Sequence, residues 1–470
     1  MTPPLTSGET LGSFLAWLIV IPIVFGFVLK APKLVVLGFL TVIFMFSESA
    51  WGELKADHNI YSRGVGIFYF SLLNLILLIA GAGAYIKQLA NPYGTRLAAP
   101  MAKYLVAFAF LLFSHLVIGM MVGIDLDVIL GPRGILNVIN MLVFMYLVVM
   151  AFRNANDSER LLYVILLLAL IRGMFGLVRY IWLGGDSANP YRNLDGFDTK
   201  IFFFDIGDNF VASIAAFCAA WLLGSSQVRL SFFKRVFLWG LLALELAAVA
   251  LSFRRSALLG LAFMFMLLVL RLPPRKRIQF GVIAVGVLVG IATVFFQDRL
   301  QYAGHGASKG ILSALMFDVN PEQSVSQSRF YELYAAAKSV GDNWLFGLGT
   351  WGTFTGDPVR LSYHMGVFDF IHSGFGHLVM KTGVVGMVMF SLLLMAFTSY
   401  YFRNRKNVTG IRQLLADAGF GGLLFWIPTL LIGTPIIEFR TMLLFGFTLA
   451  LPFVAVGLEN HKVQTRYAVA

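Results

Sequence analysis

Two adjacent arginines stand where an apolar chain has little reason to carry charge. Arg254 and Arg255 lie in the stretch LSFRRSALLG, residues 251–260, between two long apolar runs. A guanidinium offers several N–H donors and can bind two phosphate oxygens at once, so an anion is a natural partner for this pair. The alternative is that both side chains extend to lipid headgroups or pair with a nearby carboxylate.

Arg329 is a third candidate for anion binding. The segment SRFYELYAAAKSVG, residues 328–341, has the spacing of an amphipathic helix with Ser328 as its N-cap and Gly341 as its stop. Arg329 would lie in the first turn, where free backbone N–H groups attract phosphate and disfavour a cation unless an anion is close. A solvated surface arginine is the alternative.

His372 is the candidate for proton transfer. It stands where a polar segment enters the apolar run of residues 374–401. A neutral imidazole at this position can accept the proton of a sugar hydroxyl, as a general base must. The alternative is an interfacial histidine bonded to the backbone. For His377 and Lys381, which follow in the same run, we expect packing or internal bonding roles.

Weaker candidates for substrate binding are two glycines and two arginines. Gly347 and Gly349 belong to a glycine-rich turn that would let the backbone approach a substrate closely. Arg172 lies within an apolar run, where a charge is costly and favours a polar cavity. Arg440 either faces the site or forms an ion pair with Glu438 at the rim.

Metal and cofactor chemistry have little support in the residues. Asp125 and Asp127 form a D-x-D, a spacing that holds a divalent ion in some transferases, but a solvated loop is the expected interpretation. The sequence has no zinc-ligand cluster, P-loop, dinucleotide fingerprint or G-x-S-x-G. Cys218 is the only cysteine, so an internal disulfide is excluded. We therefore expect no metal and no cofactor.

A membrane-embedded helical bundle must position these residues. Of the 470 residues, 59% are hydrophobic and 13% are charged, too apolar a balance for a soluble protein of this size. Apolar runs able to cross about 30 Å of hydrocarbon recur along the chain and predict an all-α polytopic transmembrane helical bundle of about 12–14 spans. The expected spans cover residues 11–29, 33–50, 65–86, 104–122, 134–152, 161–183, 209–224, 236–252, 256–270, 278–296, 374–401, 414–433 and 441–458.

The whole chain, residues 1–470, is expected to form a single integral membrane domain. Its one long connection, residues 297–373, would contain the amphipathic helix. The first apolar run follows no basic segment and no small-residue cleavage site, so we expect a retained helix and not a cleaved signal.

The distribution of lysine and arginine between alternate connections predicts the orientation. The strongly basic connections are assigned to the cytoplasm, which places the Arg254–Arg255 turn and the 297–373 loop on the outer face. The net charge of +12 follows largely from this topology, with a secondary attraction to anionic headgroups of the lipid bilayer. It gives no reason to expect nucleic acid as a partner.

Four stretches together resemble the bacterial O-antigen ligase and polymerase superfamily of membrane glycosyltransferases. DNFVASIAAF, residues 208–217, is similar to the family's N-x-x-A helix start, and SFRRSALLGL, residues 252–261, is similar to its S-R-G-A-x-L pattern, with Arg255 on the family arginine. GLGTWGTF, residues 347–354, resembles G-x-G-x-x-F with one extra residue before the phenylalanine. HSGFGHLVMKTGVVG, residues 372–386, resembles H-N-x-Y-L followed by G-x-x-G, with serine in place of asparagine. The likeness covers residues 205–458.

The resemblance implies an inverting, metal-independent transferase in the bacterial inner membrane with its active site facing the periplasm. The donor would be an oligosaccharide on undecaprenyl diphosphate, with Arg255, Arg329 and Arg254 binding the diphosphate and His372 accepting the proton of the acceptor. If the acceptor is another lipid-linked repeat unit, the protein is an O-antigen or exopolysaccharide polymerase, which could have a chain-length regulator as a partner. If it is lipid A core, the protein is an O-antigen ligase.

Two other classes of function stay open at this point. A flippase or other transporter of lipid-linked oligosaccharides would also need a polar cavity and intramembrane arginines, but it predicts an internal repeat that the sequence does not display. A noncatalytic membrane scaffold is the second alternative.

Overall fold

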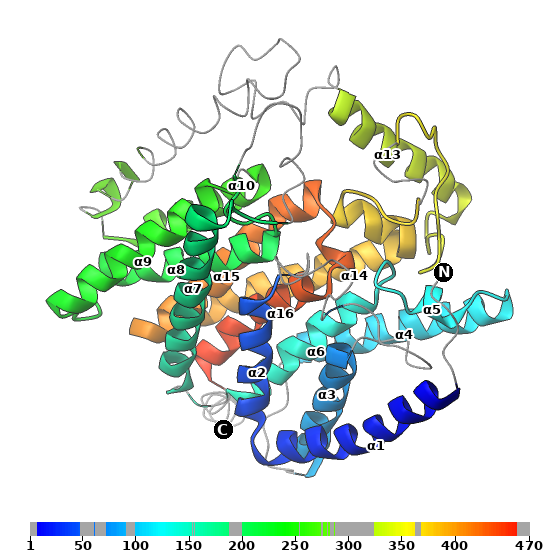
Figure 1. The fold of residues 1–470 in the computed structure, drawn as a ribbon, viewed down its shortest axis with the longest axis horizontal. Coiled ribbons are helices and arrows are strands. Elements are labelled where there is room, and N and C mark those ends of the chain that lie inside the picture. Colours follow the sequence, from blue (N-terminus) through cyan, green and yellow to red (C-terminus); the bar gives the residue numbers. More distant parts are fainter. Residues whose placement is uncertain are drawn as a thin grey trace.

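The protein is seen here in a computed structural model that describes residues 7–47, 61, 72–90, 99–152, 154, 156–187, 200–252, 254–273, 276–279, 281–282, 286, 324–361 and 368–457. Within these ranges the regular elements are helices, and no strand occurs. The expected all-α polytopic bundle is confirmed (Figure 1).

Twelve of the thirteen expected spans correspond to helices, and the expected span 278–296 lies largely outside the described residues. The twelve helices are α1 (Ser7–Lys30), α2 (Pro32–Met45), α3 (Leu72–Ala90), α4 (Ala99–Met121), α6 (Leu136–Ala151), α7 (Asp157–Trp182), α8 (Ile206–Gly224), α9 (Phe232–Ala250), α10 (Arg255–Arg271), α14 (Gly374–Asn404), α15 (Gly410–Ile432) and α16 (Phe439–Val456). The short α5 (Leu126–Ile129) and the amphipathic α13 (Ser324–Val340) lie between spans.

Fewer of these helices than expected could cross a membrane alone. By length and composition, seven of the described helices qualify, or eight if α1 and α2, which meet at an angle of 114°, form one broken span. Two physical reasons apply. Helix α9 has 19 residues but carries three charged side chains, Lys234, Arg235 and Glu245. Helices α2, α6 and α10 are short, with 14, 16 and 17 residues. At 1.5 Å per residue, even the longest of these three falls short of about 30 Å of hydrocarbon.

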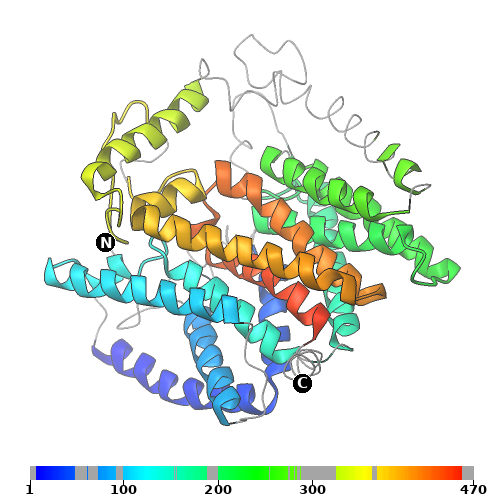
Figure 2. The same cartoon turned by 180° about the vertical axis from the view of Figure 1, so that it is seen from behind.

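Helix α16 forms the centre of the bundle. All its residues are buried, and it packs mainly against α6 and α15, with smaller contacts to α2, α7, α8 and α14 (Figures 1 and 2). Gly446 lets α16 approach α6 closely, since a Cβ at this position would collide with the carbonyl oxygen of Met141. By contrast, α4 exposes Val106, Phe110 and Phe113, as expected for a helix that faces lipid.

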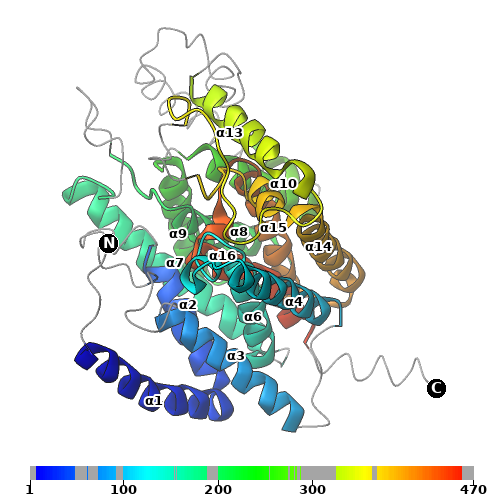
Figure 3. The ribbon, with the colours of Figure 1, turned by 90° about the vertical axis from the view of Figure 1, so that its right-hand side faces the viewer.

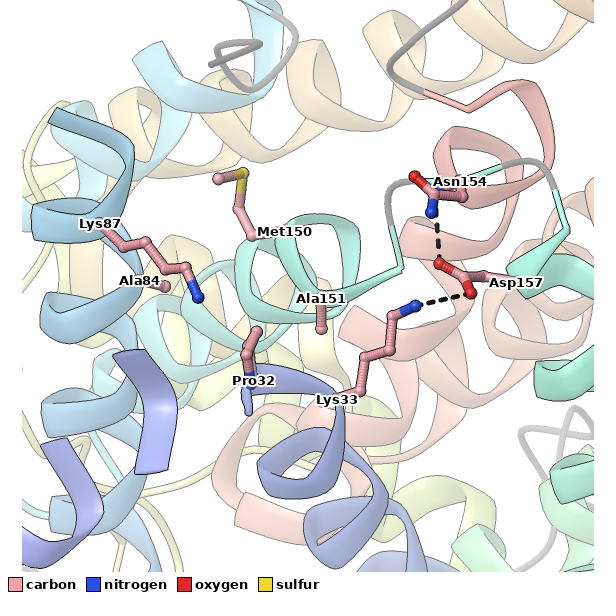
Figure 4. Close-up of a pocket in the computed structure, with 8 residues that line it drawn as sticks. All are labelled: Pro32, Lys33, Ala84, Lys87, Met150, Ala151, Asn154 and Asp157. Atoms are coloured by element: carbon pink, nitrogen blue, oxygen red, sulfur yellow. Dashed lines mark hydrogen bonds and ion pairs between the residues drawn. The ribbon is translucent and has the colours of Figure 1, made fainter. Parts of the chain in front are cut away.

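A small pocket of about 190 Å³ brings together three connections that the charge distribution assigns to one side of the membrane. Lys33 Nζ lies 2.8 Å from Asp157 Oδ1, and Figure 4 shows Lys87 across the pocket from this pair. Lys87 also donates a hydrogen bond to the carbonyl oxygen of Leu29. These contacts link the start of α2, the end of α3 and the start of α7. None of the candidate site residues lines this pocket.

The glycine-rich turn, residues 343–354, interrupts the backbone hydrogen bonds of α14 near the start of this helix. At Gly383, where φ is +63°, the helix is kinked. The N–H groups of Val384 and Val385 donate to the carbonyl oxygens of Trp344 and Leu345, at 2.9 and 3.1 Å, in place of their usual partners four residues earlier. In return, the N–H of Leu348 donates to Met380 O at 2.8 Å. The turn is therefore inserted into the hydrogen-bond ladder of a membrane span.

Candidate functional site

One cavity of about 450 Å³ gathers the four principal candidates. It is lined by Arg254, Arg255, Arg329 and His372, which come from three separate parts of the chain. The α9–α10 turn, α13, the segment before α14 and the α15–α16 connection form its walls, and Figure 3 shows α13 lying across this end of the bundle. Helix positions thus create a cluster that no local sequence motif contains.

The turn between α9 and α10 holds the two arginines at the cavity. Ser252 stabilises the turn, because its hydroxyl donates to Val249 O at 2.6 Å and accepts from the N–H of Arg254 at 3.2 Å. The guanidinium of Arg254 lies 4.4 Å from the ring centroid of Phe204, a cation–π contact that orients it. Arg255 is the first residue of α10 and is half-buried. Arg254 is therefore held by its neighbours, and both side chains keep some exposure to the cavity.

Arg329 reaches the cavity from a position in α13 that differs from the expected one. The helix begins at Ser324, four residues before the expected N-cap Ser328, so Arg329 lies in its second turn. The free N–H groups of a helix start are therefore not at this residue. Arg329 Nη1 donates to Ile432 O at 3.5 Å, a long contact with the end of α15.

His372 is placed by the start of α14. Ser373 is the N-cap of this helix and accepts a hydrogen bond from the N–H of Gly376 at 3.2 Å. Asparagine, which the resembled pattern has here, is also a favoured N-cap, so the replacement keeps the local geometry. The His372 ring contacts the Phe370 ring edge-on at 5.1 Å and faces the carboxylate of Glu332 on α13. The residue thus joins α13 to the entrance of α14.

Glu438 contributes a carboxyl group to the same cavity. It precedes α16 and accepts a hydrogen bond from the Thr441 hydroxyl at 2.6 Å. Burial in the recess, together with the neighbouring carboxylate of Asp205, raises the pKa of Glu438 to about 7, although Arg254 and Arg440 oppose this shift. A group that changes charge near neutral pH therefore lies among arginines suited to an anion.

Arg172 and Arg440 do not line the cavity. They form a buried ion network in which Asp208 is shared: Arg172 binds it through two nitrogens at 2.7 and 3.1 Å, and Arg440 binds it at 2.6 Å. Arg440 also lies 3.1 Å from Asp205 and donates to Ile43 O at 2.7 Å. The expected rim pair between Arg440 and Glu438 is replaced by these contacts. The network joins α2, α7, α8 and α16 beside the cavity wall.

Gly347 and Gly349 also lie away from the cavity lining. Gly347 has φ of +73°, and a Cβ there would come within 2.6 Å of the backbone nitrogen of Gly383. The close approach that Gly347 allows is therefore to α14, whereas a Cβ at Gly349 would meet the Trp351 side chain. Lys381 strengthens the join, because its Nζ donates to Gly352 O at 2.6 Å. This confines Lys381 to the internal bonding that its position predicted.

The other candidates lie apart from the cavity lining. Asp125 and Asp127 are at the start of α5, and the described residues contain no group of three or more His, Cys, Asp or Glu side chains arranged for a metal ion. His377 is buried within α14, and Cys218 is buried within α8.

Two important residues were not found by sequence reasoning. Glu332 had no signal beyond its position three residues after Arg329, a spacing that puts both on one face of a helix. Asp208 was quoted within a motif but given no role. An acidic residue at the start of an apolar run, in a chain whose Arg172 lies within another apolar run, was the signal that could have identified it.

Comparison with known families supports the motifs. Residues 240–391 match a family model described as O-antigen ligase, a region that contains Arg254, Arg255, Arg329, Glu332 and His372. No curated protein matches the chain. The predicted resemblance is confirmed: residues 240–391 form an O-antigen ligase family region, consistent with the O-antigen ligase and polymerase superfamily of membrane glycosyltransferases.

Proposed function

We propose that the protein is an inverting, metal-independent glycosyltransferase that joins glycan repeat units carried on undecaprenyl diphosphate. One observation carries this proposal: Arg254, Arg255 and Arg329 line the same cavity as His372. Guanidinium groups suit the diphosphate of the donor, and an imidazole suits the acceptor hydroxyl. A lipid-linked donor also fits a cavity formed at one end of a membrane-embedded bundle.

The reaction would be a single displacement. His372 accepts the proton of the acceptor hydroxyl as that oxygen attacks the anomeric carbon of the donor. The bond between this carbon and the diphosphate oxygen breaks, and the lipid diphosphate leaves with the electron pair. The three arginines stabilise the negative charge that grows on the leaving group, the role that a divalent ion has in many transferases. One displacement inverts the anomeric configuration.

The distribution of basic residues supports an active site on the periplasmic face of a bacterial inner membrane. Of the short connections that line the cavity, α9–α10 has few lysines and arginines apart from Arg254 and Arg255, and α15–α16 has none, whereas the pocket of Lys33 and Lys87 gathers connections from the basic side. The lipid tail of the donor would stay in the outer leaflet while its diphosphate enters the cavity.

An O-antigen ligase is the second candidate, and the description of the matching family favours it. The chemistry at the donor is the same, and only the acceptor differs: lipid A core for a ligase, the sugar of another lipid-linked unit for a polymerase. Variation at the motifs, such as Arg254 and Ser256 beside Arg255, suits an enzyme adapted to one repeat unit and leads us to place the polymerase first.

Purified protein in lipid nanodiscs, incubated with a lipid-diphosphate oligosaccharide alone, separates the candidates. A ladder of longer lipid-linked glycans is the result expected for a polymerase. If transfer begins only when lipid A core is added, the protein is a ligase. No transfer to either acceptor, from protein that is folded and active in donor binding, would contradict both candidates.

A further inference from the structure

We propose that Glu332 is the positioning residue of His372, so that the two side chains act as a carboxylate–imidazole pair. This inference rests on the proposed function, since it assigns to α13 the task of preparing the general base. It also gives α13 two tasks, because the same helix carries Arg329 to the cavity.

The contacts of Glu332 are directed at both the ring and the backbone of His372. Oε1 accepts a hydrogen bond from the backbone N–H of His372 at 2.7 Å. Both carboxylate oxygens lie 3.3 Å from Nδ1 of the ring. The Glu332 side chain is 1% exposed, whereas the His372 side chain is 29% exposed and lines the cavity. The carboxylate is therefore behind the imidazole and the substrate space is in front of it.

This arrangement selects one form of the imidazole. An ionised carboxylate accepts hydrogen bonds and cannot donate one, so it favours the tautomer with its proton on Nδ1. Nε2 then carries the lone pair that can take the proton of an acceptor hydroxyl. When it does, the ring becomes positively charged, and the buried carboxylate stabilises this charge over a short distance. The negative charge thus contributes most during the displacement itself.

The ring has a second orienting contact within its own segment. Phe370 lies edge-on to it and is itself 5.5 Å from the guanidinium carbon of Arg133. Nη1 of Arg133 lies 2.7 and 2.8 Å from the two carboxylate oxygens of Asp369, with which it forms an ion pair. These contacts restrict the orientation of the ring, but an aromatic edge offers no strong acceptor to Nδ1. The acceptor that faces this nitrogen is the Glu332 carboxylate.

Glu332→Gln is the sharpest test of the pair. Glutamine keeps an oxygen that can accept from the backbone N–H of His372, so the loop should hold its place while the charge is lost. We expect the kcat for glycan transfer to fall about 10²- to 10⁴-fold, since neutralising the carboxylate of a Ser-His-Asp triad costs about 10⁴, while the KM for the lipid-linked donor changes less than about threefold. Glu332→Asp should recover at least a tenth of the wild-type kcat. Lys338→Gln, an exposed change on the same helix, is the control and should keep full activity.

A spectroscopic measurement separates this inference from the proposed function. In protein labelled with ¹⁵N-histidine, the His372 signals are assigned by their loss in His372→Gln. The wild type should have the Nδ1-protonated tautomer, and Glu332→Gln should have a mixture. This result can be read even if no transfer is detected, in which case the proposed function fails and the pair stands. Wild-type kcat in Glu332→Gln, or a wild-type ring protonated on Nε2, would overturn the pair. If Glu332→Gln does not fold, the wild-type tautomer and the kcat of Glu332→Asp decide.

Discussion

Glu438 connects the electrostatics of the cavity to pH. Its carboxyl group is half-protonated near pH 7 and shares the cavity with Arg254 and Arg255. As the pH rises from 6 to 8, its charge competes with a bound diphosphate for the arginines. We expect the KM for the donor to rise about tenfold over this range, the effect of one added charge a few ångströms away. In Glu438→Gln, KM should stay nearly constant. An equally steep rise of KM with pH in Glu438→Gln would mean that another group causes the effect.

The same carboxyl group predicts how stability depends on pH. Its pKa in the folded protein, about 7, is above its ordinary value of 4.5. The folded state therefore binds the proton more tightly than the unfolded state, and the stabilisation is complete below pH 4.5 and lost as the pH rises through 7. In thermal unfolding in detergent, the stability of Glu438→Gln relative to the wild type should increase between pH 5 and pH 8. A constant difference across this range would contradict the assignment.

Removal of Arg255 or His372 tests the reaction at single residues. His372→Ala removes the base and should lower transfer by at least about 10²-fold. Arg255→Ala should lower transfer by a similar factor, because the variant loses a guanidinium that donates hydrogen bonds to the negative charge growing on the leaving diphosphate. Both variants should insert and accumulate normally, since both side chains border the cavity. Lys338→Ala is the control. If either variant made glycan chains of near wild-type length, the substituted residue would not belong to the site.

At the scale of elements, the insertion of the glycine-rich turn into α14 predicts a strong effect of one methyl group. Gly383→Ala would place a Cβ against Leu345 O, closer than van der Waals contact allows, and would force alanine to a φ of +63°. We expect a loss of at least about 1–2 kcal/mol in unfolding free energy, from the backbone alone. Transfer should also fall, because the turn connects α13 to α14.

Gly240→Ala is the matched control for this substitution. Gly240 lies within α9, and the space that a methyl group would take there is open. Alanine there should be neutral or should stabilise by up to about 1 kcal/mol. Equal stability of the two alanine variants in thermal unfolding would contradict the insertion.

The buried ion network predicts a large loss of stability when its shared carboxylate is removed. Asp208→Ala leaves Arg172 and Arg440 buried without their shared carboxylate and should cost about 3–5 kcal/mol. Asp357→Ala is the control, since it breaks the exposed pair with Arg360 and should cost less than about 1 kcal/mol. Unfolding of both variants in detergent measures the difference. A small effect of Asp208→Ala would mean that water reaches the network.

Helix positions could be predicted well because apolar runs are a local signal, and ends such as Arg255 at the start of α10 follow from the same pattern. The break at Gly383 and the start of α13 at Ser324 could not, because both depend on contacts with distant segments. The ion-pair partners of buried arginines could not be predicted either. An arginine within an apolar run indicates a buried partner, but the identity of that partner, Asp208, depends on how three helices pack.

At the scale of the whole molecule, arginines in place of a metal ion predict behaviour in chelator. Transfer by the purified protein should continue unchanged in excess EDTA. Activity that is lost in EDTA and restored by magnesium or manganese would instead indicate a metal site at Asp125 and Asp127. The matched test is Asp125→Ala with Asp127→Ala, which should leave transfer intact.

The join between the glycine-rich turn and α14 is made by main-chain groups, at residues 344–348 and 380–385. Backbone donors and acceptors are the same for every non-proline residue, so Trp344, Leu345 and Phe346 can be exchanged without unfastening the turn, provided that the glycines remain. The side chains of this segment, which are exposed, can therefore vary while the break in α14 is kept.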